Sequence, residues 1–458
     1  MNKAADRWIE ENMQALIADL STALSFDSVQ GEAEEGKPFG PVVADCLEST
    51  LAAAARMGFR TENLDNYAGY AEAGEGSEVL GIITHLDIVP AGDGWIHDPF
   101  GAVIDDGKLY GRGTLDDKGP AIMSLYALKA VLEAGVQLRR RVRVIFGCNE
   151  ESGMKCIEHY KEVCGAPDLS FSPDNTYPLV SCEKSGSGCV IKKRYESGIT
   201  FSSGTVSNIV PASATAFVRD VDAQTVERIA MRMGITEEFG LELEESEEGV
   251  EITVTGVQSH ASKPQLGKNA MQGLIKLLTR VPLDEEDSDA VRALYGIFEL
   301  DYNGQKLGLD KSDASGRLTL NLGTMRWDEN GYELKLDLRV PNEVPEEYVK
   351  ERLQAACDEL GAEMLNFRYS KGFTLAEDCE LVSGLLKVFK ERTGIQDARP
   401  LSSGGGTYAR KLPNAVSFGP EGYKCESDAH ESNEFITLEQ LDFNTKMIAD
   451  AIIELAGK

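Results

Sequence analysis

Residues 78–90 read EVLGIITHLDIVP, and this stretch decides how the first part of the chain folds. A short apolar run that gives way to polar residues and a proline is typical of a buried strand. Residues 121–135, AIMSLYALKAVLEAG, then form a helix that stops at glycine, and residues 140–151, RRVRVIFGCNEE, form a second buried strand. Strands that alternate with helices predict an α/β sheet with parallel strands, whose chemistry lies at the carboxyl ends of the strands.

The pattern changes near residue 185 and changes back near residue 375. Residues 249–256, GVEITVTG, alternate apolar and polar side chains, as half-exposed antiparallel strands do. We therefore predict an α/β catalytic domain formed by residues 1–184 and 375–458. Its sheet is mixed and mostly parallel, with helices on both faces. Residues 185–374 are predicted to form an inserted α+β domain.

Composition limits the partners and the location of the protein. A chain of 458 residues is longer than one hydrophobic core usually holds. The net charge of −30 argues against nucleic acid and against membrane surfaces as partners. We expect no secretory signal and no membrane span, because the first 20 residues form a charged amphipathic pattern and no long apolar run follows. Nine cysteines without a CxxC pair fit reduced thiols, so we predict a cytoplasmic protein.

Histidine and acidic residues follow the predicted strands. His85 and Asp87 lie in THLD, and an H-x-D pair often holds a metal-bound imidazole, although a buried structural histidine is the alternative. Asp116 lies in the glycine-containing loop YGRGTLDDKG. Helix capping would explain one of the two aspartates in that loop, but not both.

Further acidic residues repeat this placement. Glu150 and Glu151 end the second strand, where adjacent carboxylates repel each other unless a cation is near; a surface turn is the alternative. Asp174 lies in LSFSPDNTYP, and His430 lies in CESDAHESNEF. Two histidines and several carboxylates together favour a two-metal site with nitrogen and oxygen ligands. Neither HExxH nor GxSxG occurs, so the sequence does not support a zincin-type metalloprotease or a serine hydrolase with a nucleophile elbow.

The order of these motifs resembles the co-catalytic metallopeptidase superfamily that contains carboxypeptidase G, aminoacylases, succinyl-diaminopimelate desuccinylase and carnosinase. The motifs in question are HLD, GRGTLDDKG, NEESG, SPD, SHAS and AHESNE. The resemblance extends over nearly the whole chain. Within the superfamily it is to the PepV-type dipeptidases, and the motifs that carry it are GWIHDPF, SNIVP, QSHASKP, LDLRVP and SSGGGTYAR.

The resemblance implies two divalent metal ions, with Zn²⁺ expected and Mn²⁺ or Co²⁺ as alternatives. Each ion would have one imidazole and one carboxylate of its own, and the ions would share a bridging carboxylate. The implied ligands are His85, Asp174 and bridging Asp116 for one ion, and Asp116, Glu151 and His430 for the other.

The resemblance also assigns residues that act beside the ions. Glu150 would be the general base that takes a proton from the water or hydroxide between them and passes it to the leaving amine. Asp87 would orient His85. The peptide bond between Asp116 and Asp117 would be cis.

The insertion would be a lid of two ferredoxin-like halves that carries the substrate contacts. His260 would stabilise the oxyanion. Arg339 would hold the C-terminal carboxylate of the substrate through a bidentate fork, and Asn208 would add a polar contact. Gly404 and Gly405 would offer backbone N–H groups to the same carboxylate.

We predict a dipeptidase that cleaves unblocked dipeptides, so the partner is a small peptide. The insertion is long enough for one chain to supply both halves of the lid, which implies a monomer. The main alternative is an N-acyl-amino-acid deacylase or desuccinylase on the same metal centre. A non-catalytic peptide-binding relative would lack Glu150 or a ligand, and every expected position is filled here.

Overall fold

The computed structural model describes residues 1–427 and 429–458 and divides the chain into two compact units. The first unit comprises residues 1–182, 375–401 and 406–458, and the second comprises residues 183–374 and 402–405. The predicted boundaries differ at two places, since residues 183–184 and residues 402–405 belong to the second unit. The reason is hydrogen bonding: the Lys184 N–H donates to the Ser403 carbonyl at 2.9 Å, and Arg339 Nη1 donates to the Gly404 carbonyl at 2.8 Å.

The first unit is built on a mixed sheet with the strand order β1-β2-β6-β3-β7-β24-β9. The four central strands β6, β3, β7 and β24 pair in parallel, and the strands at both ends pair antiparallel. The strands are β1 (Arg60–Leu64), β2 (Ala68–Ala73), β3 (Val79–His85), β6 (Arg141–Gly147), β7 (Leu169–Ser172), β9 (Val180–Glu183) and β24 (Ala415–Ser417).

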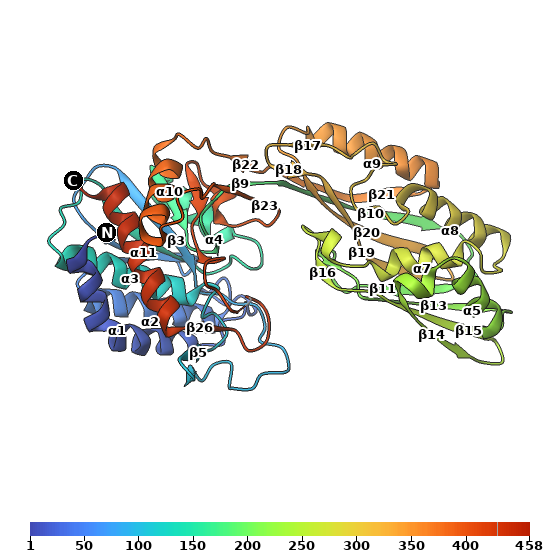
Figure 1. The fold of residues 1–458 in the computed structure, drawn as a ribbon, viewed down its shortest axis with the longest axis horizontal. Coiled ribbons are helices and arrows are strands. Elements are labelled where there is room, and N and C mark those ends of the chain that lie inside the picture. The colour runs from blue at the N-terminus through green and yellow to red at the C-terminus, as the bar shows by residue number, and fades with distance from the viewer. Residues whose placement is uncertain (428) are drawn as a thin grey trace. The chain divides into compact units, whose positions relative to one another are not determined.

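Helices cover both faces of this sheet. Gly69 of β2 faces Leu51 of one helix, α2. The next residue, Tyr70, packs on the guanidinium of Arg143, which donates to Tyr160 of α4 on the opposite face. In Figure 1, α1, α2, α3 and α11 lie together beside the sheet. The helices are α1 (Lys3–Leu24), α2 (Pro41–Arg56), α3 (Lys118–Glu133), α4 (Lys155–Cys164), α10 (Glu380–Thr393) and α11 (Leu438–Ala456).

The parallel centre of the sheet gathers the acidic motifs at one edge. Strand β3 is buried along its whole length and ends at His85. Strand β6 ends three residues before Glu150, and β7 ends two residues before Asp174. Because parallel strands present their carboxyl ends at the same edge, these side chains come together there.

The second unit is built on an antiparallel sheet with the order β14-β15-β13-β11-β19-β20-β10-β21. Its strands and helices share one continuous hydrophobic core, and the two sets of four strands join through β11 and β19. The predicted fold class is thus confirmed. The elements are β10 (Ser185–Arg194), β11 (Thr200–Ser203), β13 (Ser213–Arg219), α5 (Ala223–Arg232), α6 (Ile235–Glu238), β14 (Gly240–Glu245), β15 (Gly249–Thr255), α7 (Ala270–Leu278), α8 (Glu285–Phe298), β19 (Thr319–Asp328), β20 (Gly331–Val340), α9 (Glu346–Leu360) and β21 (Glu363–Ser370).

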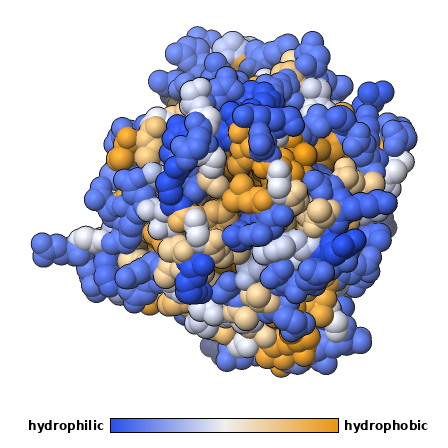
Figure 2. Space-filling model, turned by 90° about the vertical axis from the view of Figure 1, so that its left-hand side faces the viewer, coloured by the Kyte–Doolittle hydropathy of each residue, from blue (hydrophilic) through white to orange (hydrophobic). Residues whose placement is uncertain are grey.

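The molecular surface agrees with the high net charge. The face drawn in Figure 2 is largely hydrophilic, and its hydrophobic residues are gathered in separate patches. Among the described residues, no helix combines the length and the apolar character that crossing a bilayer requires.

Candidate metal centre

The first group of predicted ligands meets at the carboxyl edge of the parallel strands. His85 ends β3, Asp174 follows β7, and Asp116 lies in the loop before α3. His85 Nε2 lies 2.8 Å from Asp116 Oδ1 and 4.0 Å from Asp174 Oδ2. Each of the three residues offers one ligand atom, and these atoms all lie within 4.8 Å of one another.

The second group shares Asp116 with the first. His430 Nε2 lies 2.9 Å from the other carboxylate oxygen of Asp116, Oδ2, and 3.0 Å from Glu151 Oε1. His430 is half exposed, whereas the His85 side chain is buried. The structure therefore brings the predicted ligands together as two groups that have Asp116 in common.

These residues fit divalent ions. Within the described chain, the buried atoms His85 Nε2 and Asp116 Oδ1 make no well-aligned hydrogen bond, although only 2.8 Å separates them. Two ligand atoms that each lie about 2.1 Å from a tetrahedral zinc ion are roughly 3.4 Å apart. A nitrogen and an oxygen that lie this close without a hydrogen bond between them therefore suit binding to the same ion. Imidazole nitrogen and carboxylate oxygen are also the ligand types that zinc, manganese and cobalt accept.

The electrostatics of the site favour a bound cation. Burial raises the pKa of Asp174 well above its usual value, and the charge of Asp116 raises it further. Burial likewise raises the pKa of Glu150 to about 8, with an added contribution from neighbouring Glu151. Hydrogen bonds to Asp116 and Glu151 raise the pKa of His430 to about 11. Buried carboxylates with raised pKa values are an acidic cluster that a divalent ion would neutralise.

Asp87 lies closer to His85 with its main chain than with its carboxylate. His85 Nδ1 lies 2.8 Å from the main-chain carbonyl of Asp87, to which it can donate, and 3.6 Å from the carboxylate. The Asp87 carboxylate instead accepts the backbone N–H groups of Glu150 at 3.0 Å and Glu151 at 3.1 Å. Asp87 thus orients the imidazole with its backbone, and its side chain fixes the turn that carries the two glutamates.

Replacing Asp87 by alanine is therefore expected to destabilise the metal-free protein. The partly buried N–H groups of Glu150 and Glu151 would lose their acceptors, at a cost of roughly 1–3 kcal/mol each. Urea unfolding with EDTA present should show a free energy of unfolding lower by about 2 kcal/mol or more. The matched control is Asp93→Ala, at an exposed loop position. Equal unfolding midpoints for Asp87→Ala and the control would contradict the assigned role.

The peptide bond between Asp116 and Asp117 is cis, as the resemblance implies. Asp117 then points back toward the first ligand, since its carboxylate accepts the backbone N–H of His85 at 3.0 Å.

Sequence reasoning missed two buried partners of the ligands. Arg112 and Glu434 form an ion pair at 2.6 Å, and their side chains are 1% and 0% exposed. Each residue lies inside a motif that also contains a predicted metal ligand: Arg112 in GRGTLDDKG and Glu434 in AHESNE. Their place in these motifs was the signal in the sequence that could have identified them. Tyr408 was also missed: its ring lies edge-on to His85, with centroids 6.3 Å apart.

The second unit holds the predicted substrate contacts. Short strands β12 (Ile209–Val210) and β16 (Ser259–His260) pair Ile209 with His260, and the Ala261 N–H donates to the Asn208 carbonyl at 2.8 Å. His260 Nδ1 accepts the backbone N–H of Ser262 at 3.1 Å and lies 2.7 Å from its hydroxyl. Asn208 and His260 are therefore neighbours within this unit.

Arg339 on β20 lies in a second cluster of the same unit. Asp337 holds its guanidinium with two hydrogen bonds of 2.8 and 3.2 Å. In the glycine loop, the carbonyl of Gly404 accepts a hydrogen bond from Arg339 Nη1 at 2.8 Å. The Gly405 N–H donates to the Ser403 hydroxyl at 3.0 Å, so the loop is organised around Arg339 and its own serine.

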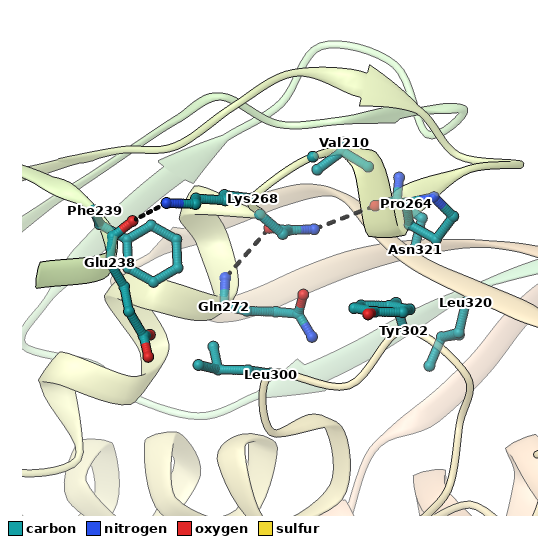
Figure 3. A pocket seen from close by; sticks show the side chains of 12 residues that line it. Val210, Glu238, Phe239, Pro264, Lys268, Gln272, Leu300, Tyr302, Leu320 and Asn321 are labelled. Atoms are coloured by element: carbon teal, nitrogen blue, oxygen red, sulfur yellow. Dashed lines mark hydrogen bonds between the residues drawn. The ribbon is translucent and has the colours of Figure 1, made fainter. Parts of the chain in front are cut away.

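A pocket within the second unit lies beside α7. Figure 3 shows Lys268 donating to the Glu238 carbonyl. Asn269, which also lines the pocket, donates to the side chain of Asn321 at 3.2 Å. None of the described residues that line it is among the predicted site residues. The pocket nevertheless borders the motifs of Asn208 and His260, because Val210 and Pro264 line it.

Known proteins resemble this chain over nearly its full length. "Putative dipeptidase YtjP" of Bacillus subtilis is 36% identical over 96% of this chain and 97% of its own length. Human carnosine dipeptidase 1 superposes with a TM-score of 0.61 at 14% identity, covering 98% of both chains. The dipeptidase Dug1p of Saccharomyces cerevisiae also gives 0.61 at 14% identity, over 99% of both chains. The two solved structures support the fold alone.

The family assignment comes from the sequence. The profile of Peptidase family M20/M25/M40 matches residues 81–454, which include the ligand groups and the second unit. The chain belongs to peptidase family M20/M25/M40, and the prediction of a metal-dependent hydrolase from the superfamily of carnosinase is confirmed.

Proposed function

We propose that this protein is a dinuclear-metal dipeptidase that hydrolyses the peptide bond of unblocked dipeptides. The observation that carries the proposal is the sharing of Asp116 between two ligand groups, each with its own histidine and acidic residue. The dipeptidase name of the relative from Bacillus subtilis supports the substrate class.

The proposed ligand set has a sensible charge. Asp116, Asp174 and Glu151 contribute three negative charges, so two divalent ions leave one positive charge for an anionic nucleophile. When bound, the ions would lower the pKa of a water molecule and polarise the scissile carbonyl. Zn²⁺ is the ion we propose, with Mn²⁺ and Co²⁺ as alternatives that accept the same ligands.

Glu150 is the proposed general base. Its backbone N–H is held by Asp87, and partial burial together with the charges of Glu151 and Asp116 raises the pKa of its carboxylate. Bound cations would favour the ionised form of Glu150, which could then accept a proton from the attacking water and deliver it to the leaving amine.

His260 is the proposed donor to the oxyanion. Because Nδ1 accepts a backbone N–H from Ser262, the neutral ring carries its proton on Nε2. That tautomer can donate to an oxygen that gains negative charge in the transition state. Asn208, next to the His260 strand, would add a polar contact.

Arg339 is the proposed anchor for the substrate carboxylate, and its replacement by lysine should affect binding more than chemistry. Lysine cannot form the bidentate fork, and a hydrogen bond between charged groups contributes roughly 1.5–3 kcal/mol. KM for a free dipeptide should rise about 10- to 100-fold, while KM for the same dipeptide with a C-terminal amide should change little. Arg219→Lys, at an exposed position in the same unit, is the control. Equal effects on both substrates would contradict the carboxylate role.

The substrate class is tested by hydrolysis of a small panel after the metal-stripped protein is reloaded separately with Zn²⁺ and Mn²⁺. The panel holds a free dipeptide, its N-acetylated form, a tetrapeptide and an N-acetyl amino acid, with Glu150→Ala as the inactive control. Cleavage of the free dipeptide alone is the expected result. Cleavage of the N-acetyl amino acid with the dipeptide untouched would replace this proposal with a deacylase.

We further propose that the enzyme acts as a cytoplasmic monomer. All nine cysteines are free thiols, as in a reducing compartment, and more than half of them are buried. The inserted segment is long enough for one chain to supply both sets of four strands of the second unit, which supports a monomer.

A further inference from the structure

The buried ion pair between Arg112 and Glu434, which we call the Arg112–Glu434 clamp, connects two ligand segments of the first unit. Its charged atoms lie 2.6 Å apart, and both side chains are almost completely buried. Removing two charges from water is costly, so a buried pair is weak evidence for a role in stability alone. What the pair holds in place is therefore informative.

Glu434 organises the loop that carries Asp116. One carboxylate oxygen, Oε1, accepts backbone N–H groups from Gly113 at 3.1 Å, Leu115 at 2.8 Å and Asp116 at 3.4 Å. The other oxygen, Oε2, accepts from Arg112. Glu434 and Asp116 are 318 residues apart in the sequence, so this contact determines where the shared ligand lies relative to the His430 segment.

Arg112 holds the segment that carries His430. Its Nη2 donates to the main-chain carbonyl of His430 at 3.2 Å and to that of Ala91 at 3.3 Å. His430 itself has a φ of +67°, a left-handed conformation that few non-glycine residues adopt without local support. The face of the Trp95 ring, 5.4 Å from the guanidinium carbon, completes the surroundings of Arg112.

We propose that the Arg112–Glu434 clamp is a positioning device that sets Asp116 and His430 at ligand distance for the second metal site, an inference that rests on the proposed dinuclear centre. The first site depends on it less. His85 is placed by β3 and by the Asp87 carbonyl, and Asp174 by the end of β7. Loss of the clamp therefore weakens the site of Asp116, Glu151 and His430 more than the site of His85, Asp116 and Asp174.

The test is titration of metal-free protein with Co²⁺, followed by calorimetry and by the visible absorption of the bound ion. The binding event that His430→Ala abolishes identifies the second site. Glu434→Gln is expected to weaken that event about 10- to 100-fold, as loss of other outer partners of metal ligands does, and to leave the other event within about threefold. Because Glu434→Gln leaves Arg112 charged and buried, the double variant R112M/E434Q, which removes both charges, is measured in parallel.

Two controls separate positioning from general stability. Glu380→Gln disrupts the Arg140–Glu380 pair of the same unit, and both binding events should stay unchanged. Arg112→Lys keeps the positive charge, but lysine cannot donate to the Glu434 carboxylate and to the His430 carbonyl at the same time as the guanidinium does. His430 should therefore move, and the visible absorption of Co²⁺ at the second site should shift.

Unchanged binding in a folded Glu434→Gln or double variant would overturn the proposal, as would equal weakening of both events. A wild-type protein that binds fewer than two ions would overturn the dinuclear centre itself, which is a different and separately visible result.

Discussion

Replacing Glu150 by glutamine is expected to reduce kcat about a thousandfold while both metal ions stay bound. General acid–base catalysis contributes roughly 10²- to 10⁴-fold, and glutamine of the same shape cannot accept the proton of the attacking water. KM should change little, because Glu150 lies outside both ligand groups and contributes no proposed contact to the substrate carboxylate. Steady-state kinetics on a free dipeptide and metal analysis of the same sample measure the two effects together.

The matched control is Glu162→Gln, which makes the same chemical change on the exposed side of α4. It should keep wild-type kcat. A Glu150→Gln enzyme with more than a tenth of wild-type kcat would contradict the role of general base. Loss of bound metal in that variant would instead assign Glu150 to the ligands.

Replacing Asp116 by asparagine is expected to remove both ions from the protein. Its two carboxylate oxygens face different histidines, at 2.8 Å from His85 and 2.9 Å from His430. An amide is neutral and has only one oxygen, so it cannot bridge two cations. Affinity for each ion should fall more than roughly a hundredfold, since loss of an outer partner alone costs about 10- to 100-fold. Equilibrium dialysis against Zn²⁺, with metal analysis, measures both affinities.

Asp174→Asn is the matched comparison for Asp116→Asn. Asp174 belongs only to the group that contains His85, so its replacement should weaken one binding event and spare the other. If Asp116→Asn also lost a single ion and kept the second, Asp116 would not be a shared ligand.

The sequence predicts the framework because it contains strong local signals. Strand β3 is a continuous buried run that ends at His85, and β6 has the same character before Glu150. Parallel pairing places the ends of such strands at one edge, so acidic residues that are distant in the sequence could be assigned to one site. Which ligand lies next to which followed from the family resemblance, not from spacing alone.

The contacts that the sequence does not predict are main-chain contacts and long-range pairs. Nothing in the letters HLD tells whether the carbonyl or the carboxylate of Asp87 faces His85. In the same way, the letters of a glycine loop do not show that the Gly404 carbonyl points to Arg339. Arg112 and Glu434 lie 322 residues apart, and each could equally have been an exposed charge.

The dinuclear centre is best tested by crystallography of the zinc-loaded protein at wavelengths on either side of the zinc absorption edge. We expect two anomalous peaks about 3.5–4 Å apart, as in other two-metal sites. Asp116 should lie between them, with His85 and Asp174 at one peak and Glu151 and His430 at the other. A single peak, or two peaks that do not share Asp116, would contradict the dinuclear centre.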